Sequence, residues 1–170
     1  MRSSRDFALC PEPKKVAGFT IVEMMVVVGV VAILALMMVP AYNDRLVREQ
    51  VNEALPLAEV AKKPVAAAWA LAQVLPADNA AAGLPVKEKI VSDLVSGVAI
   101  EGGAIHMTFG NRANSQIRGK TLTLRPAVVE DAPVVPVTWL CGFAAVPEKM
   151  AAKGANRTDV HRNFLPLKCR

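Results

Sequence analysis

Histidine and cysteine are scarce in this chain of 170 residues, and their scarcity limits the chemistry that the protein can perform. The two histidines, His106 and His161, have no Cys, Asp or Glu residues at the spacing of a metal site. The three cysteines form no C-x-x-C motif, so the sequence does not indicate a thiol-based catalytic site. No glycine-rich stretch has the strand-to-helix context of a phosphate-binding loop. We therefore expect no catalytic residue, no metal and no cofactor, and predict that the protein is not an enzyme.

A strong excess of one sign of charge is also missing. The chain has 20 basic and 15 acidic residues. Residues 19–170 alone carry 16 basic and 13 acidic side chains, which is a net charge of +3. So mild a value gives little support to nonspecific binding of nucleic acid. The length allows one ordinary domain plus an extended element, and hardly a second domain.

Apolar residues are in excess, and many of them lie in one segment. From Phe19 to Val39 the chain contains a single charged residue, Glu23, and Pro40 follows this segment. Because about 20 apolar residues of helix cross a bilayer, we predict a transmembrane segment over residues 19–40. The apolar region of a signal peptide is shorter, about 7–15 residues. A buried helix of a soluble protein is the other alternative, but this segment lacks the polar face that such helices usually keep.

The flanks of the segment predict its orientation. Lys14 and Lys15 precede it, and the positive-inside bias keeps them in the cytoplasm and sends the C-terminal part across the membrane. A carboxylate such as Glu23 is costly within a membrane and usually has a partner. The segment offers no basic side chain before Arg45, so the candidate partner is the α-amine that a cut before Phe19 would create, on the same or a neighbouring subunit. The alternative is an acid that snorkels to water.

The residues around Glu23 form a specific motif. It reads Gly18-Phe19-Thr20-Ile21-Val22-Glu23, with two lysines before it and an apolar run after it. In this region the chain closely resembles the type IV prepilins. The resemblance implies that residues 1–18, which include Cys10, are a leader that prepilin peptidase removes by cutting between Gly18 and Phe19. It also implies N-methylation of Phe19 and contact of Glu23 with the N-terminus of a neighbouring subunit during assembly.

Beyond the apolar segment the pattern becomes that of an amphipathic helix. Small and apolar residues recur at steps of four and three: Val47, Val51, Ala54, Ala58, Ala61, Val65, Ala68 and Ala72. We expect Trp69 to fill the space between the end of this helix and the rest of the fold. Pro40, Pro56 and Pro64 should each kink it. The sequence therefore predicts one long, bent helix over residues 19–74, with separate helices meeting at Pro64 as the alternative.

The remaining residues, 75–170, are expected to form a globular head. Residues 75–85 have the composition of a loop. Four strand-like segments follow, at Val98–Glu101, Ile105–Phe109, Thr121–Leu124 and Val137–Cys141. Gly102-Gly103 is a suitable turn between the first two. We predict an α+β fold, in which a four-stranded antiparallel sheet packs one face on the helix, and we expect His106 to face solvent.

The C-terminus carries a second resemblance to the same family. Trp139-Leu-Cys141-Gly and Phe164-Leu-Pro166-Leu-Lys-Cys169 are similar to the two ends of the disulfide-bounded loop of type IV pilins. The resemblance implies a disulfide between Cys141 and Cys169 that closes the loop 141–169. Basic residues lie in this loop or beside it: Lys149, Lys153, Arg157, Arg162, Lys168 and Arg170. They are expected to be a solvated surface or, repeated along a filament, a weak binding surface for DNA or other anionic surfaces. Asn156-Arg157-Thr158 is a formal glycosylation sequon.

These observations together predict a structural subunit of a type IV pilus. Its expected partners are further copies of itself, prepilin peptidase and the pilus assembly machinery. The precursor would span the inner membrane once with its N-terminus in the cytoplasm, and the assembled pilus would be extracellular. Twitching motility, adhesion and DNA uptake are the roles that the resemblance implies. The alternatives are a minor pilin, a type II secretion pseudopilin, for which no calcium-site cluster of Asp and Asn is evident, and a membrane-tethered periplasmic enzyme.

Overall fold

The computed structural model describes residues 18–170, although the side chains of residues 39–41 are not described. The predicted leader therefore lies, except for Gly18, outside the described residues, as do Cys10 and the two lysines before the motif. The chain divides into two parts between Val39 and Pro40. The helix α1 (Ile21–Ala54) contributes residues to both parts.

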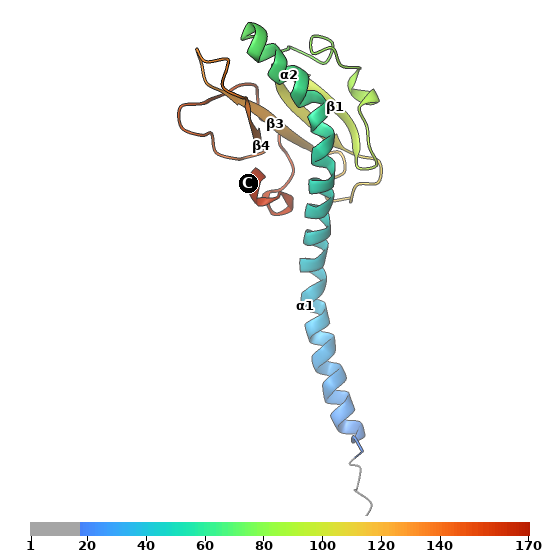
Figure 1. Cartoon of the computed structure of the whole chain (residues 1–170). Helices are drawn as coiled ribbons and strands as arrows, with labels where there is room; N and C mark the ends of the chain where they lie inside the picture. The colour runs from blue at the N-terminus through green and yellow to red at the C-terminus, as the bar shows by residue number, and fades with distance from the viewer. Residues whose placement is uncertain (1–17) are drawn as a thin grey trace, which may run out of the picture. The chain divides into compact units, whose positions relative to one another are not determined.

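The predicted long helix is confirmed, and its interruption lies at Pro56. The helix α1 is followed by a single 3₁₀ turn, η1 (Leu55–Ala58), and then by α2 (Glu59–Ala72), shown in green in Figure 1. Proline has no N–H for an i→i−4 hydrogen bond, and the tighter turn at Pro56 keeps the chain helical past this position. Pro64 lies inside α2, so the alternative of separate helices at this residue is wrong. The helix ends where Gln73 adopts a left-handed conformation with φ of 54° and donates its N–H to the Trp69 carbonyl.

The stripe of small residues forms the helical side of the core in the second part. Its first six members are buried: Val47, Val51, Ala54, Ala58, Ala61 and Val65. Toward the end of the helix the stripe is less buried, because Ala68 is half-buried and Ala72 is exposed. Trp69 is buried next to them instead, as expected. One indole side chain buries as much apolar area as several alanines. Trp69 therefore supplies most of the buried surface of the last turn of the helix.

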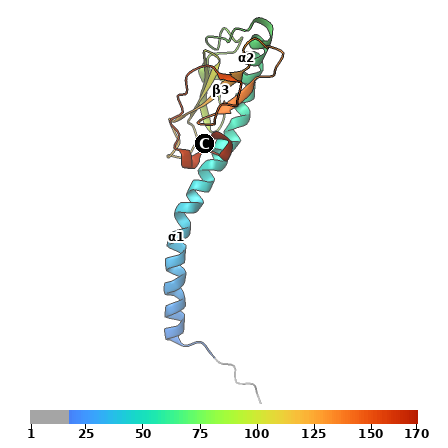
Figure 2. The same cartoon turned by 90° about the vertical axis from the view of Figure 1, so that its left-hand side faces the viewer.

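The head contains the predicted antiparallel sheet of four strands. In order across the sheet these are β1 (Val95–Glu101), β2 (Ala104–Phe109), β3 (Thr121–Val128) and β4 (Thr138–Cys141). Gly102 and Gly103, with φ of 54° and 82°, form the predicted turn between β1 and β2. A fifth strand, β5 (Ala151–Ala152), pairs with the end of β3. It was not predicted because two alanines have no strand signature. The sheet packs on α2 and the neighbouring part of α1 (Figures 1 and 2), so the α+β fold is confirmed.

Both faces of the central strand β2 are buried. Ile105, Met107 and Phe109 belong to the core between the sheet and the helix. His106 lies on the opposite face and is only 5% exposed, so the expectation that it faces solvent is wrong. Alternation along the strand correctly separates His106 from the core residues. It does not reveal that residues 153–159, about 50 positions later in the chain, cover the other face of the sheet.

Candidate functional site

The start of α1 has a hydrogen-bonded cap. The Thr20 hydroxyl accepts a hydrogen bond from the backbone N–H of Glu23 at 3.2 Å, and the Thr20 carbonyl accepts one from the N–H of Met24 at 3.2 Å. Thr20 therefore occupies the N-cap position, with Glu23 three residues later in the first turn. A negative charge in this turn also interacts favourably with the helix dipole. Part of the motif thus serves the helix itself, a role that was not predicted above although Thr-x-x-Glu is the usual signature of a capping box.

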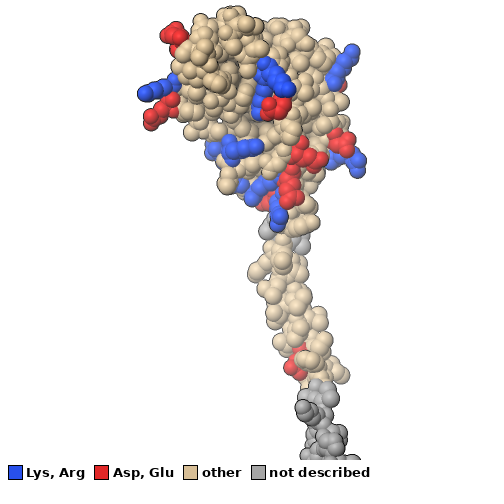
Figure 3. Space-filling view, viewed as in Figure 1, with Lys and Arg blue, Asp and Glu red and all other residues tan. Residues whose placement is uncertain are grey.

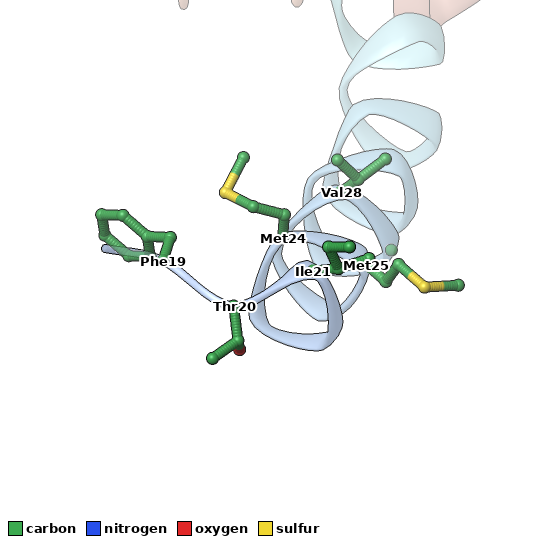
Figure 4. Close-up of a pocket in the computed structure, with 7 residues that line it drawn as sticks. Phe19, Thr20, Ile21, Met24, Met25 and Val28 are labelled. Carbon is green, nitrogen blue, oxygen red and sulfur yellow. The ribbon is translucent and has the colours of Figure 1, made fainter. Parts of the chain in front are cut away.

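The apolar helix that follows is exposed on all sides. All fifteen large apolar side chains from Phe19, just before the helix, to Met38 are exposed, with Phe19 at 74% and Leu36 at 76%. Near the start, an open groove is lined by seven residues, and Figure 4 shows the Phe19 ring standing apart from the helix on one side. The helix is long and apolar enough to cross a membrane. Exposed apolar surface of this extent indicates a lipid or protein environment.

Glu23 is exposed within this apolar surface. Among residues 18–170 no ion pair involves its carboxylate. The next charged residue along the chain is Asp44, which is also acidic. A cation for Glu23 therefore has to come from the α-amine of a processed chain, from residues 1–17 or from another molecule.

The peptide bond between Gly18 and Phe19 lies just before the helix. Both residues are exposed and lie outside the helix, which begins at Ile21. A Cβ atom added at Gly18 would meet nothing within 4 Å. Within the described residues, the chain itself therefore has no steric need for glycine at this position.

In the second part of the chain, a disulfide closes the C-terminal loop. The sulfur atoms of Cys141 and Cys169 are bonded, and the Cα atoms lie 4.5 Å apart. Cys141 is the last residue of β4, and Cys169 lies in the 3₁₀ turn η4 (Leu167–Cys169). Two buried apolar residues of the loop, Val160 and Leu165, join the core. The guanidinium of Arg48 also donates a hydrogen bond from Nε to the Asn163 carbonyl at 2.6 Å, which ties the loop to the helix.

Two of the six basic residues of the loop are paired with acidic side chains. The Lys153 ammonium pairs with Glu130, and this hydrogen bond lowers the pKa of the Glu130 carboxyl. Arg157 pairs with Glu101 at 2.6 Å. Arg170 donates to the Leu165 carbonyl, and Arg162 lies 4.3 Å from the centre of the Phe143 ring. Figure 3 shows acidic and basic side chains interspersed on the visible face of the head.

The sequon residues are used within the fold. The Asn156 side chain donates to the Gly142 carbonyl at 2.8 Å and accepts the N–H of Thr158 at 3.1 Å. Both groups of the amide are therefore engaged, which does not favour glycosylation at Asn156. Among the described residues no three His, Cys, Asp or Glu side chains are grouped to hold a metal ion.

Comparison with known proteins matches both parts of the chain. The sequence pattern described as pilin (bacterial filament) matches residues 47–170, and the prokaryotic N-terminal methylation motif matches residues 13–39. A fimbrial protein of Neisseria meningitidis serogroup B is 32% identical over 162 residues, which cover 90% of this chain and 93% of that protein. The type IV major pilin protein PilE of Neisseria gonorrhoeae is 37% identical over 126 residues, covering 74% and 73%. The fimbrial protein EcpC of Eikenella corrodens is 39% identical over 131 residues, covering 75% and 83%. The chain therefore belongs to the pilin family.

Proposed function

We propose that the protein is a structural subunit of a type IV pilus, made as a membrane-inserted precursor and assembled with further copies of itself into a surface filament. The observation that carries this proposal is the exposed apolar helix from Phe19 to Met38 in a member of the pilin family. A bilayer would cover its fifteen large apolar side chains before assembly, and helices of neighbouring subunits would cover them afterwards. The disulfide-closed head would then form the outside of the filament.

Processing between Gly18 and Phe19 is part of this proposal. The bond is exposed and non-helical, which suits the active site of a peptidase. Since Gly18 has open space around its Cα, the small residue serves the peptidase and not the fold of the described residues. The new α-amine of Phe19, before or after methylation, is the cation that we assign to Glu23, either in the same chain or in a neighbouring subunit.

The names of the relatives favour a pilus subunit over the alternatives. The matched proteins are described as fimbrial proteins and type IV major pilins, and none of those cited here is described as a secretion pseudopilin or as an enzyme. A minor pilin shares the same helix and head, so abundance in the filament has to separate it from a major subunit. Roles in twitching motility, adhesion, and binding of DNA or surfaces stay predictions from the resemblance.

The decisive experiment is intact mass spectrometry of the protein in sheared filaments and in the membrane fraction of the same cells. We expect a chain that begins at methylated Phe19, contains the Cys141–Cys169 disulfide and is abundant in the sheared fraction. The processed chain in membranes alone would favour a minor pilin or a pseudopilin. A chain that retains residues 1–18 in cells with active prepilin peptidase would contradict the proposal. The variant Gly18→Ala should remain uncut and membrane-bound, with an unchanged head.

A further inference from the structure

A segment of the disulfide loop crosses the outer face of the sheet. Residues 153–159, here called the strap, lie between β5 and the buried Val160. At its start the Lys153 N–H donates to the Pro126 carbonyl at 2.9 Å, and at its end the Asp159 N–H donates to the Thr121 carbonyl at 3.1 Å. These two anchors lie near opposite ends of β3, so the strap passes over the middle of the sheet.

The strap approaches the sheet closely at Gly154. This residue has φ of 79°, and a Cβ atom there would lie 2.5 Å from the Ala104 Cβ. Further along, the Arg157 N–H donates to the Thr123 hydroxyl at 3.0 Å, and the Thr123 N–H donates to the Thr158 hydroxyl at 3.1 Å. The strap contributes no fully buried side chain, so polar contacts hold it in place. A segment with so little apolar burial opens at a lower free energy than the core.

His106 lies directly under the strap. In the register of β2 and β3 it faces Thr123, and its Nδ1 atom is 3.0 Å from the Thr123 hydroxyl oxygen. The same oxygen already accepts the Arg157 N–H. The buried Nε2 atom of His106 has no hydrogen-bond partner among the described residues. A protonated ring donates from both nitrogens, so this site would leave the Nε2 donor unsatisfied.

The charges around His106 do not compensate for its burial. β1 contributes Glu101, which the strap residue Arg157 neutralises. β3 contributes Arg125, on the same face as Thr123 by strand alternation, and the strap contributes Lys153 and Asp159, whose carboxylate accepts the Thr121 N–H. Burial lowers the pKa of His106 from its ordinary value; Glu101 acts in the opposite direction and Arg157 in the same one.

We propose that the strap is an acid-opened latch: protonation of His106 favours a state in which the strap has lifted from the sheet while the Cys141–Cys169 disulfide keeps the loop attached. Opening would hydrate the imidazole and uncover the Ala104–Thr123 region of the head surface. The device depends only on contacts within residues 101–159 and on the disulfide, and it is independent of the filament role.

Linkage gives the direction and size of the effect. Well above pH 6.5, the ordinary pKa of the imidazole, His106 is neutral whether the strap is closed or open. As the pH falls below this value, the open state binds a proton and the closed state does not, so the opening equilibrium shifts toward open. One proton changes the opening constant by at most about tenfold per pH unit, and the change levels off once the pH falls below the lowered pKa of the closed state.

Amide hydrogen exchange of the full chain in detergent micelles, with the disulfide oxidised, tests the latch. After correction for the intrinsic effect of pH, exchange at Arg157 and Thr123 should rise by up to about tenfold per unit below pH 6.5. His106→Asn keeps a group near Nδ1 but does not titrate, and it should abolish this rise. The matched control, His161→Asn, removes the exposed histidine of the same loop and should behave as the unchanged chain does.

Three results would overturn the latch. One is an amide exchange rate at Arg157 and Thr123 that, after correction for the intrinsic effect of pH, stays constant between pH 7.5 and 5 in the unchanged chain. A second is the same pH dependence in His106→Asn, which would mean that the opening does not depend on protonation of His106. The third is simultaneous exposure of core amides such as that of Met107, which would mean global unfolding. If His106→Asn does not fold, an NMR pH titration of the His106 ring in the unchanged chain tests the proposal instead. A pKa at or above 6.5 for His106 would refute the proposal.

Discussion

Loss of the Cys141–Cys169 disulfide should destabilise the head by several kcal/mol. The bond joins residues 28 positions apart, so it closes a loop of 29 residues counting both cysteines. The chain-entropy relation for a loop of this length gives about 3.6 kcal/mol at 25 °C. With a urea dependence of about 1–3 kcal/mol per molar, the midpoint of unfolding should fall by about 1–4 M. Reduction of the unchanged chain should give this shift without any change in packing volume.

Tryptophan fluorescence is a suitable assay, because both tryptophans, Trp69 of α2 and Trp139 of β4, lie in the part of the chain that contains the head and the helix packed on it. Urea titrations would compare the oxidised chain, the reduced chain and the double variant Cys141→Ala/Cys169→Ala. The reduced chain isolates the effect of the cross-link, and the double variant adds the cost of two small cavities at buried positions. A midpoint shift below about 0.5 M on reduction would refute the argument, since the loop would then be restrained in the unfolded chain by something other than the disulfide.

Three further predictions concern single positions. Phe109→Ala, which empties a fully buried site of β2, should lower the free energy of unfolding by about 3–5 kcal/mol, measured by the same urea titration. Gly154→Ala should raise amide exchange in the strap at all pH values, because the new methyl group would overlap Ala104; unchanged exchange would contradict the close approach. Leu71→Ala, at a side chain that is 88% exposed, should change the unfolding free energy by less than about 0.5 kcal/mol and serves as their control.

Much of the fold could be predicted because its signals are local. The steps of four and three from Val47 to Val65 follow from the pitch of a helix that buries one side. The turn at Gly102 and Gly103 needs positive φ angles, which the residue type reveals directly. The burial of His106 and the partial exposure of Ala68 and Ala72 could not be predicted, for a common reason. Their burial depends on residues far away in the chain or on a larger neighbour, Trp69, that competes for the same space.

In the candidate site, too, the features with a local sequence signal could be predicted and the others could not. The motif and the two C-terminal cysteines are visible in the sequence, and the structure joins Cys141 to Cys169. The N-cap of Thr20 also has a local signature, Thr-x-x-Glu, and the structure shows its hydrogen bond. The packing of the strap over the sheet has no sequence signature, because the residues of the strap are exposed or half-buried and most of them are polar. Cleavage, methylation and the assembly role of Glu23 involve other molecules and stay predictions.

Glu23 lies in the first turn of a capped helix and is also an acid on an apolar surface. Three variants can decide which of these two settings filament assembly requires. Gln at the third helical position serves a capping box as Glu does, so Glu23→Gln removes the charge and keeps the local geometry. Thr20→Ala does the reverse: it removes the hydroxyl that accepts the Glu23 N–H and keeps the charge, at a cost of about 1 kcal/mol to the helix.

If Glu23 acts through its charge, the yield of sheared filaments should collapse in Glu23→Gln and Glu23→Ala alike and should change little in Thr20→Ala. The membrane content of the chain and the urea midpoint of its head should be the same in all three, which separates assembly from insertion and folding. Normal filament yield from Glu23→Gln, together with loss in Glu23→Ala and Thr20→Ala, would instead assign the acid to the helix cap. The two roles make different demands on residue 23, since a capping box needs only a side-chain oxygen at this position, and pairing with an α-amine needs the negative charge.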